Sequence, residues 1–203
     1  MGRTSDAKDR LVSSASERLY ALGYQGVGVE ELCNHAGVKK GSFYHFFPSK
    51  QDLAIAALDF QWDLAREGMV EPAFKSDLPP LGRIHRFFEL MAEASASEKS
   101  SVGYVGGCRF GNLSAEMSSH DPNIREKVGA IFQAITDYFE QALAEAKQGG
   151  ELPNIDPVVN AQALMAYMEG ILLLGRTYDD PSLMKKLASK AIDLAQGTSN
   201  DAR

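Results

Sequence analysis

The side chains best suited to binding chemistry gather between residues 39 and 50, in the run KKGSFYHFFPSK. Lysine ammonium groups and serine hydroxyls are common partners of nucleic-acid phosphates. Residues 1–50 carry seven Lys and Arg against five Asp and Glu, a net charge of +2, whereas residues 51–203 carry 14 against 22, a net charge of −8. A mildly basic N-terminal quarter precedes an acidic body, which favours a small nucleic-acid reader joined to a larger part with another task.

Motifs that carry catalytic or metal chemistry are missing from the sequence. It has no glycine-rich phosphate loop after a strand, no GxSxG elbow and no helical HExxH. The histidines are scattered, and neither cysteine has a second ligand at metal-like spacing. These residues are His35, His45, His85, His120, Cys33 and Cys108. We therefore expect no enzyme, no metal site and no cofactor.

The expected location is cytoplasmic. No apolar run approaches the roughly 18 residues that a membrane span needs, and the first ten residues, MGRTSDAKDR, lack the apolar segment of a secretory signal. A reducing compartment would keep both cysteines as thiols, so a structural disulfide is not expected.

Apolar spacing and breakers predict an all-α protein of about nine helices. Glycine or proline ends each of the first three, and Ser49 is expected to cap the fourth, with Asp52 three residues on. The runs EPAFKSDLPPLG (71–82) and SASEKSSVGYVGG (95–107) are expected to be connections. The expected helices are Ser5–Leu22, Val29–Ala36, Lys40–Phe46, one from Ser49 through Leu64, Leu81–Ala96, Cys108–Met117, Pro122–Lys147, Pro157–Tyr178 and Ser182–Gln196.

The second and third of these helices, joined by a turn at Gly37, have the arrangement of a helix-turn-helix. Leu32 and Ala36 would face Phe43 in the core, with Cys33 as a small residue in the packing seam. The third helix would then be the recognition helix. The candidate DNA contacts are Lys39, Lys40, Gly41, Ser42, Tyr44, His45 and Lys50. An aromatic cluster that serves only as core is the alternative, and it is the interpretation we adopt for Phe43, Phe46 and Phe47.

The run GSFYHFFPSKQDL, preceded by GVGVEELCNHAGVKK, resembles the DNA-binding signature of TetR-family transcriptional repressors over about Ser5–Leu58. The resemblance implies a helix-turn-helix domain at 1–50 and a helical domain at 51–203 that binds a small molecule and forms a homodimer through its last two helices. It also implies repression at a palindromic double-stranded operator. The chain departs from the family at Val29, where many members carry Thr or Ser, so Gly28 or the Val29 amide would have to make the phosphate contact often made there.

The helix expected at Pro157–Tyr178 carries apolar residues around much of its circumference, which favours a dimer interface, with a buried core helix as the alternative. Gly170 and Gly175 would permit close approach of helices. Candidate side chains for an effector pocket are Phe87, Phe88, Met91, Tyr104, Phe110, Met117, Phe132, Tyr138, Tyr167 and Met168. Methionine and aromatic side chains suit a flat or apolar compound.

Cys108 lies in the run YVGGCRFGNLSAEM, where a short helix is expected to begin. A helix N-terminus and the neighbouring Arg109 would both lower the pKa of the thiol and make it more reactive. The segment resembles that of TetR-family repressors that respond to electrophiles such as N-ethylmaleimide, quinones and aldehydes. Three interpretations stay open: Cys108 as an electrophile sensor, a passive cysteine beside a non-covalent pocket, and a DNA-binding regulator with no small-molecule effector.

Overall fold

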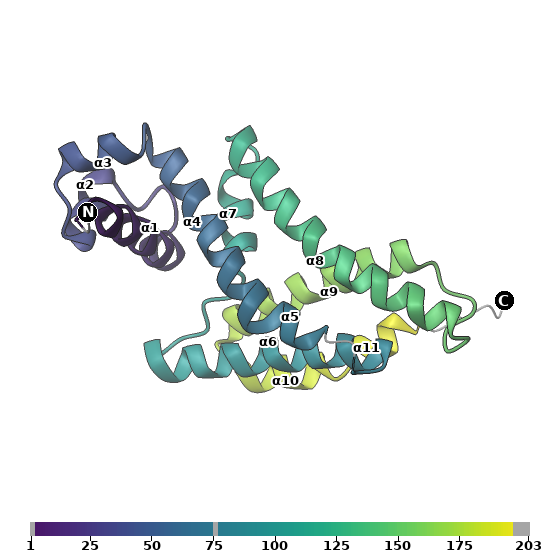
Figure 1. Ribbon diagram of the computed structural model, residues 1–203. Helices are drawn as coiled ribbons and strands as arrows, with labels where there is room; N and C mark the ends of the chain where they lie inside the picture. The colour runs from purple at the N-terminus through teal and green to yellow at the C-terminus, as the bar shows by residue number, and fades with distance from the viewer. Residues whose placement is uncertain (1–2, 75–76, 197–203) are drawn as a thin grey trace. The chain divides into compact units, whose positions relative to one another are not determined.

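The computed structural model describes residues 3–74 and 77–196, and all regular structure in these ranges is helical (Figure 1). The expected all-α class is confirmed. The expected last helix is divided in two, and two short elements follow α4. The elements are α1 (Arg3–Leu22), α2 (Val29–Ala36), α3 (Lys40–Phe46), α4 (Lys50–Ala65), the π-helix η1 (Arg66–Val70), α5 (Glu71–Ala73), α6 (Pro80–Val102), α7 (Arg109–Met117), α8 (Pro122–Gln148), α9 (Pro157–Tyr178), α10 (Pro181–Ala188) and α11 (Ala191–Ala195).

By packing, the chain forms two compact units. The first unit holds Met1–Ala65 and Arg109–Ile131, and the second holds Arg66–Cys108 and Phe132–Arg203. The sequence suggested a functional boundary at residue 50, and that boundary stays a prediction. The packing adds that α7 and the start of α8 belong to the same compact unit as the three N-terminal helices.

In the first unit, α1 packs against α2, α3, α4 and α7 (Figure 1). Apolar side chains from α1, α2, α3 and α4 form the core of this unit, and Cys33 lies in it as a small hydrophobic residue. Its buried members are Leu11, Ala15, Val27, Leu32, Cys33, Ala36, Val38, Phe43, Phe47, Leu53 and Ala57.

Aspartate and serine side chains cap the helices where the sequence predicts it. The Ser49 hydroxyl accepts the Asp52 N–H at 3.2 Å at the start of α4. Asp121 accepts the N–H groups of residues 123 and 124 at the start of α8, and Asp156 accepts those of residues 158 and 159 at the start of α9. These carboxylates bind amides that the helix itself leaves without an acceptor.

Two segments expected to be connections contain helix. The run 71–82 begins in α5 and ends in α6, and α6 continues through Val102 instead of ending at Ala96. The expectation failed at 95–102 because the serines bond within the helix: Ser95 and Ser100 each donate to the carbonyl four residues earlier at 3.0 Å. Gly103, with φ 91°, ends α6 in the left-handed conformation.

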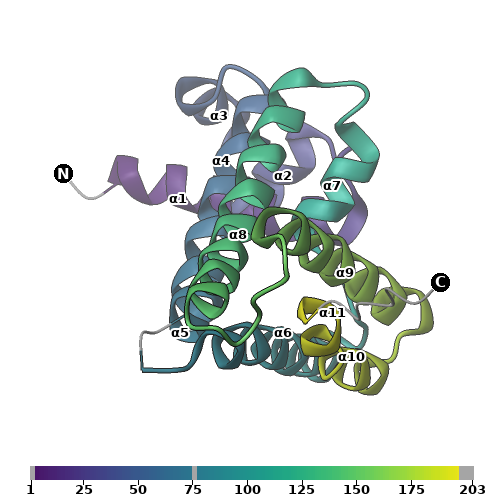
Figure 2. The same cartoon turned by 90° about the vertical axis from the view of Figure 1, so that its right-hand side faces the viewer.

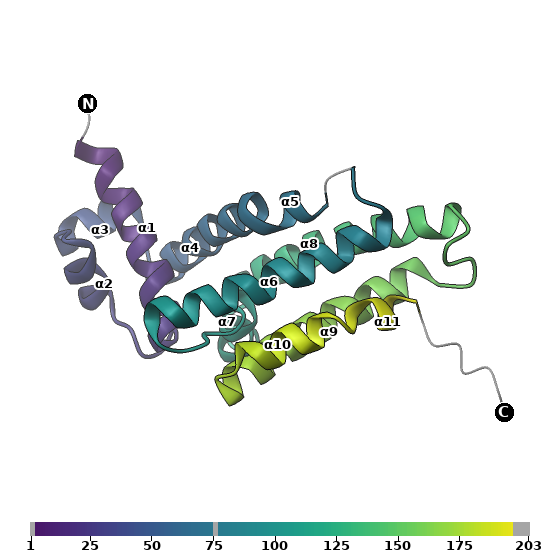
Figure 3. The same ribbon diagram turned by 90° about the horizontal axis from the view of Figure 1, so that it is seen from below.

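In the second unit, α10 and α11 turn back along α9 and also pack on α6 (Figures 2 and 3). Its core is aromatic. The rings of Phe87, Phe88 and Phe139 are fully buried, and Phe87 meets Phe139 edge to face at 5.1 Å between centroids. Phe74 lies 5.9 Å from both Phe87 and Phe139.

Among the described residues, α9 is long and apolar enough to cross a membrane by length and composition alone. This is weak evidence for a span, because the core helix of a soluble protein passes the same test. The sequence expectation about membrane spans therefore holds only for uninterrupted apolar runs, none of which is long enough.

The contact of α9 with α10 generates a stability prediction. Gly175→Ala would place a Cβ 2.3 Å from Sδ of the fully buried Met184, so we expect a loss of about 1–3 kcal/mol in the free energy of unfolding. Gly129→Ala in α8 is the matched control: a Cβ there has no neighbour within 4 Å, and a gain of about 0.5–1 kcal/mol is expected from helix propensity. Urea unfolding at one protein concentration measures both, and equal stabilities would contradict tight packing at Gly175.

Candidate DNA-binding surface and sensor segment

The turn between α2 and α3 has the geometry that the helix-turn-helix interpretation requires. Gly37 adopts the left-handed conformation, with φ 62° and ψ 37°, and its N–H donates to the Asn34 carbonyl. The Val38 N–H donates to the Cys33 carbonyl at 2.9 Å. A side chain with a Cβ is strained at this φ, so glycine ends α2 and turns the chain into α3.

One buried side chain orients α3. Phe43 is 0% exposed, and Phe47, just after the helix, lies with its ring centroid 6.2 Å from that of Phe43. Tyr44 is 54% exposed and meets the Phe43 ring edge to face at 5.0 Å. Phe46 is partly buried against the same core. The division between inward phenylalanines and an outward tyrosine is the one the sequence predicts.

The remaining candidate contacts on this helix lie at the surface. Lys39, Lys40, Gly41 and His45 are exposed, and Ser42 is half-buried. A hollow of about 490 Å³ adjoins the start of α3. It is lined by Glu30, Cys33, Asn34, Gly37, Val38, Lys39 and Lys40. The first turn of α3 therefore presents two lysines beside a concave surface that also contains one carboxylate.

Lys50 has a different environment from the other candidates. Its ammonium donates to the carbonyls of Tyr24 at 2.9 Å and Val27 at 3.0 Å, and it lies 3.9 Å from the centroid of the Tyr24 ring. Burial lowers its pKa, an effect that the nearby Glu116 carboxylate opposes. Because an ammonium has three donors, a phosphate contact stays a prediction, but the two carbonyls give Lys50 a structural task that the sequence did not reveal.

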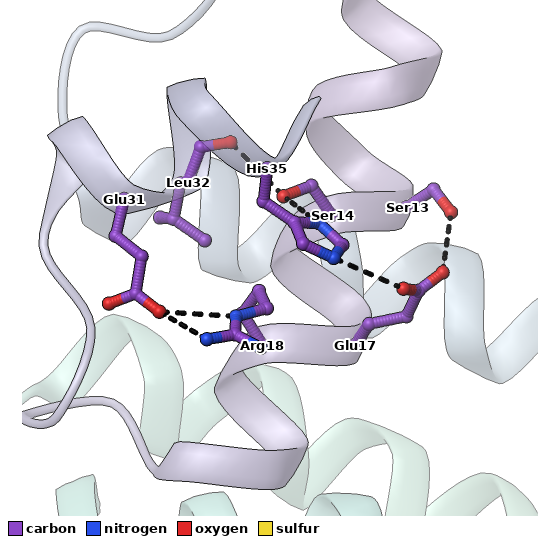
Figure 4. Close-up of polar contacts among 7 residues, drawn as sticks. All are labelled: Ser13, Ser14, Glu17, Arg18, Glu31, Leu32 and His35. Atoms are coloured by element: carbon purple, nitrogen blue, oxygen red, sulfur yellow. Dashed lines mark hydrogen bonds and ion pairs between the residues drawn. The ribbon is translucent and has the colours of Figure 1, made fainter. Parts of the chain in front are cut away.

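A serine, a histidine and a glutamate meet between α1 and α2 (Figure 4). Ser14 Oγ donates to the Leu32 carbonyl at 3.1 Å and lies 3.0 Å from His35 Nδ1, while His35 Nε2 lies 3.8 Å from Glu17 Oε2. Since the single hydroxyl proton of Ser14 goes to Leu32, Nδ1 must be the donor to Ser14. His35 therefore cannot activate the buried Ser14 as a nucleophile, and the three side chains connect two helices instead.

The same interface holds an ion pair (Figure 4). Arg18 on α1 binds Glu31 on α2 through two nitrogens, with Nε 3.2 Å from Oε1. Ser13 adds a hydrogen bond to Glu17 at 3.3 Å. Polar contacts at the rim thus add to the apolar core in setting the position of α2, the helix that precedes the recognition helix.

A carboxylate on α7 holds the connection between α1 and α2. Glu116 accepts the backbone N–H of Tyr24 at 2.7 Å and that of Gln25 at 2.6 Å. The Arg109 guanidinium lies 3.7 Å from the Tyr20 ring centroid, also within the first unit. These contacts join residues about 90 positions apart, so α7 is fastened to α1 and to the connection that leads into the helix-turn-helix.

In the second unit, acidic side chains hold the residues that precede Cys108. Asp179, the left-handed residue after α9, accepts the Val105 N–H at 2.9 Å and pairs with Lys99 at 2.9 Å. The hydrogen bond from Lys99 is the largest cause of the lowered pKa of Asp179. Glu98 accepts the Gly106 N–H at 3.1 Å. We call residues 103–108 the sensor segment.

Gly107 brings the sensor segment close to α9. It has φ 79°, and a Cβ there would lie 3.1 Å from Arg176 Cδ and 3.5 Å from the Leu172 carbonyl. Glycine is therefore required by both its conformation and its contact. Cys108 is half-buried and forms no disulfide. It directly precedes α7, whereas the sequence analysis expected it inside the first turn of that helix.

The Cys108 thiol forms a hydrogen bond with the Glu169 carboxylate on α9. Burial raises the pKa of Glu169, and the thiol contact partly offsets that rise. Within the described residues, Glu169 Oε1 is buried without a hydrogen-bond partner. Sequence reasoning missed Glu169, although a single acid in the apolar run MAYMEGILLLG is a recognisable signal of a special environment.

The candidate pocket residues are divided between the two units. Phe87, Met91 and Met168 are buried in the second unit, and the Tyr167 hydroxyl donates to the Leu187 carbonyl at 2.9 Å. Phe110 is buried on α7, in the first unit. Tyr104 is 44% exposed in the sensor segment, so the expectation that it faces an interior pocket is wrong. Tyr104 follows Gly103, the left-handed residue that ends α6, and so lies outside the helix.

Comparisons with known proteins agree with this geometry. Residues 11–57 match the family described as bacterial regulatory proteins, tetR family, and residues 80–191 match the tetracyclin repressor-like C-terminal domain. The chain is 33% identical over 169 residues to the transcriptional regulator AcuR of Cereibacter sphaeroides, covering 82% of this chain and 75% of that protein. It is 25% identical over 166 residues to the HTH-type transcriptional repressor NemR of Escherichia coli K12, covering 81% of each.

A solved structure shares the fold. The crystal structure of regulatory protein TetR from Rhodobacter sphaeroides superposes with a TM-score of 0.81 at 29% identity, over 93% of this chain and 98% of that one. The two family models together cover the helix-turn-helix and most of the remaining helices. The chain therefore belongs to the TetR family of bacterial transcriptional regulators, which bind DNA through a helix-turn-helix and are not enzymes.

Proposed function

We propose that this regulator is a repressor that binds a palindromic operator as a homodimer and leaves it when its second unit reacts with an electrophile. The observation that carries the DNA-binding half is the orientation of α3, whose buried Phe43 leaves Lys39, Lys40 and Tyr44 exposed on one surface. Relatives such as NemR are named transcriptional repressors, which supports repression. A protein that binds chromosomal DNA acts in the cytoplasm of a bacterium.

Dimerisation is proposed to use α9 together with α10 and α11. The exposed large hydrophobic residues of these helices are Val158, Val159, Leu173, Leu174, Tyr178 and Leu194. An exposed apolar surface of this kind is typical of a subunit interface. A two-fold dimer would present two copies of α3 to half-sites separated by about 34–36 Å or a multiple of it.

The electrophile response is proposed for Cys108. Support comes from its half-buried position, from the resemblance of its segment to that of electrophile-responsive repressors, and from the acidic contacts that hold the sensor segment on α6 and α9. The next residue in the chain, Arg109, begins α7, which is fastened to the α1–α2 connection by Glu116. Displacement of Cys108 would therefore move the start of α7, and α7 contacts the α1–α2 connection of the DNA-binding unit through Glu116.

A non-covalent apolar effector is the second candidate. The buried Phe87, Met91 and Met168 favour it, because such side chains line pockets for flat apolar compounds. A compound that binds only the folded protein would raise its melting temperature without forming an adduct.

The DNA-binding half is tested by Lys40→Ala, with Lys147→Ala on α8 as the matched control of an exposed lysine outside the proposed DNA contacts and dimer helices. Lys40→Ala is expected to weaken binding to the DNA upstream of the protein's own gene, and to reduce the slope of log affinity against log salt by about one per protomer. Fluorescence anisotropy titrations at several salt concentrations measure both quantities. An unchanged slope would remove Lys40 from the phosphate contacts.

The electrophile response is tested by comparing the alkylation of Cys33 and Cys108 in the same protein. Cys33 is 2% exposed and burial raises its pKa, so it should resist alkylation in the folded protein. After brief treatment with N-ethylmaleimide, peptide mass spectrometry should find the adduct on Cys108 and little on Cys33. Equal labelling, or none on Cys108, would contradict a reactive sensor.

A further inference from the structure

The proposed electrophile response gives no role to Glu169, whose carboxylate lies beside the Cys108 thiol. Glu169 lies on α9, its carboxylate receives the hydrogen bond from the Cys108 thiol, and its other oxygen is buried with no partner in the part of the chain that the structure describes. Leaving a carboxylate oxygen buried and unbonded costs free energy, so such a group needs an explanation.

The surrounding charges do not provide that explanation. Within the second unit, Lys99 pairs with Asp179, and both Glu98 and Asp179 bind amides of the sensor segment. The side chain of Arg176 lies against Gly107. For Glu169, the factors that act on its pKa are burial and the thiol of Cys108. The carboxyl group is therefore held in contact with the thiol, and no residue in the described ranges forms an ion pair with it.

We propose that Glu169 is a proton-transfer residue for Cys108 in its reaction with α,β-unsaturated carbonyl compounds. This inference rests on the proposed electrophile response. The thiol proton passes to the Glu169 carboxylate as the sulfur forms a bond to the β-carbon of the compound. The carbon–carbon π pair moves toward the carbonyl to give an enolate, and the carboxyl group then returns the proton to the α-carbon. Every atom of both reactants remains in the adduct, and no oxidant or further reactant is needed.

Two features of the geometry suit this cycle. The thiol contact places the proton donor and acceptor together before the compound arrives. Burial raises the pKa of Glu169 and so makes its carboxylate a stronger base for the thiol proton. The return of the proton is favourable because an enolate is a much stronger base than a carboxylate. A haloacetamide needs only the first half of the cycle, because its leaving halide takes the place of the enolate.

The test measures alkylation of Cys108 in the full-length protein by peptide mass spectrometry, with N-ethylmaleimide and iodoacetamide as the two probes. For Glu169→Gln at neutral pH, we expect the rate constant with N-ethylmaleimide to fall at least about tenfold, and to fall less with iodoacetamide. The Glu169→Gln rate should also follow thiol ionisation alone as pH changes. The control is Glu93→Gln, which removes an exposed carboxylate on α6 that pairs with Arg86, and it should leave both rates nearly unchanged.

Three other outcomes would each contradict a specific part of these proposals. If Glu169 acted only as a negative charge beside the thiol, its removal would lower the pKa of Cys108 and speed alkylation, so a faster variant overturns the proposal. An equal loss with both reagents overturns the return of the proton and the preference for unsaturated carbonyls. A wild-type Cys108 that resists both reagents is a failure of the proposed electrophile response itself, and the matching melting temperatures of wild type and Glu169→Gln exclude a folding defect.

Discussion

The burial of Phe43 is the interaction on which the DNA-binding half depends. A seven-residue helix such as α3 is not stable alone in water, so its position and rotation come from packing. Phe43 occupies a core shared with α1 and α2, and this contact turns Tyr44 and the two lysines outward. The hydrogen bonds of Ser14 and the Arg18–Glu31 pair then hold α2 against α1, so that the position of α3 is set on two sides.

The acidic composition of the chain has a structural meaning beyond its charge. Asp121 and Asp156 cap long helices, Glu116 binds the two amides between α1 and α2, and Glu98 and Asp179 bind amides of the sensor segment. In each case a carboxylate accepts N–H groups that no helix can satisfy. The excess of Asp and Glu after residue 50 therefore serves to fasten loops and helix ends as well as to set the net charge of −6.

Local features were readable from the sequence, and long-range ones were not. The bounds of α2 and α3 agree with expectation because Gly37 and Pro48 act on their own neighbours. The predicted end of α6 was wrong because the hydroxyls of Ser95 and Ser100 donate to carbonyls within the helix, so these serines do not end it. The tasks of Lys50 and Glu116 could not be predicted, since each joins residues separated by more than 20 positions through a fold that the sequence does not display. Glu169 carried a signal, an acid in an apolar helix, but its partner Cys108 lies 61 positions away in the sequence numbering.

The proposed switch requires that chemistry at Cys108 control DNA binding by α3. The most direct measurement is the affinity of wild-type and Cys108→Ser protein for the same upstream DNA, before and after treatment with N-ethylmaleimide. We expect treatment to release the wild-type protein from DNA, while the serine variant stays bound with its untreated affinity. Release of both proteins, or of neither, would contradict a thiol switch.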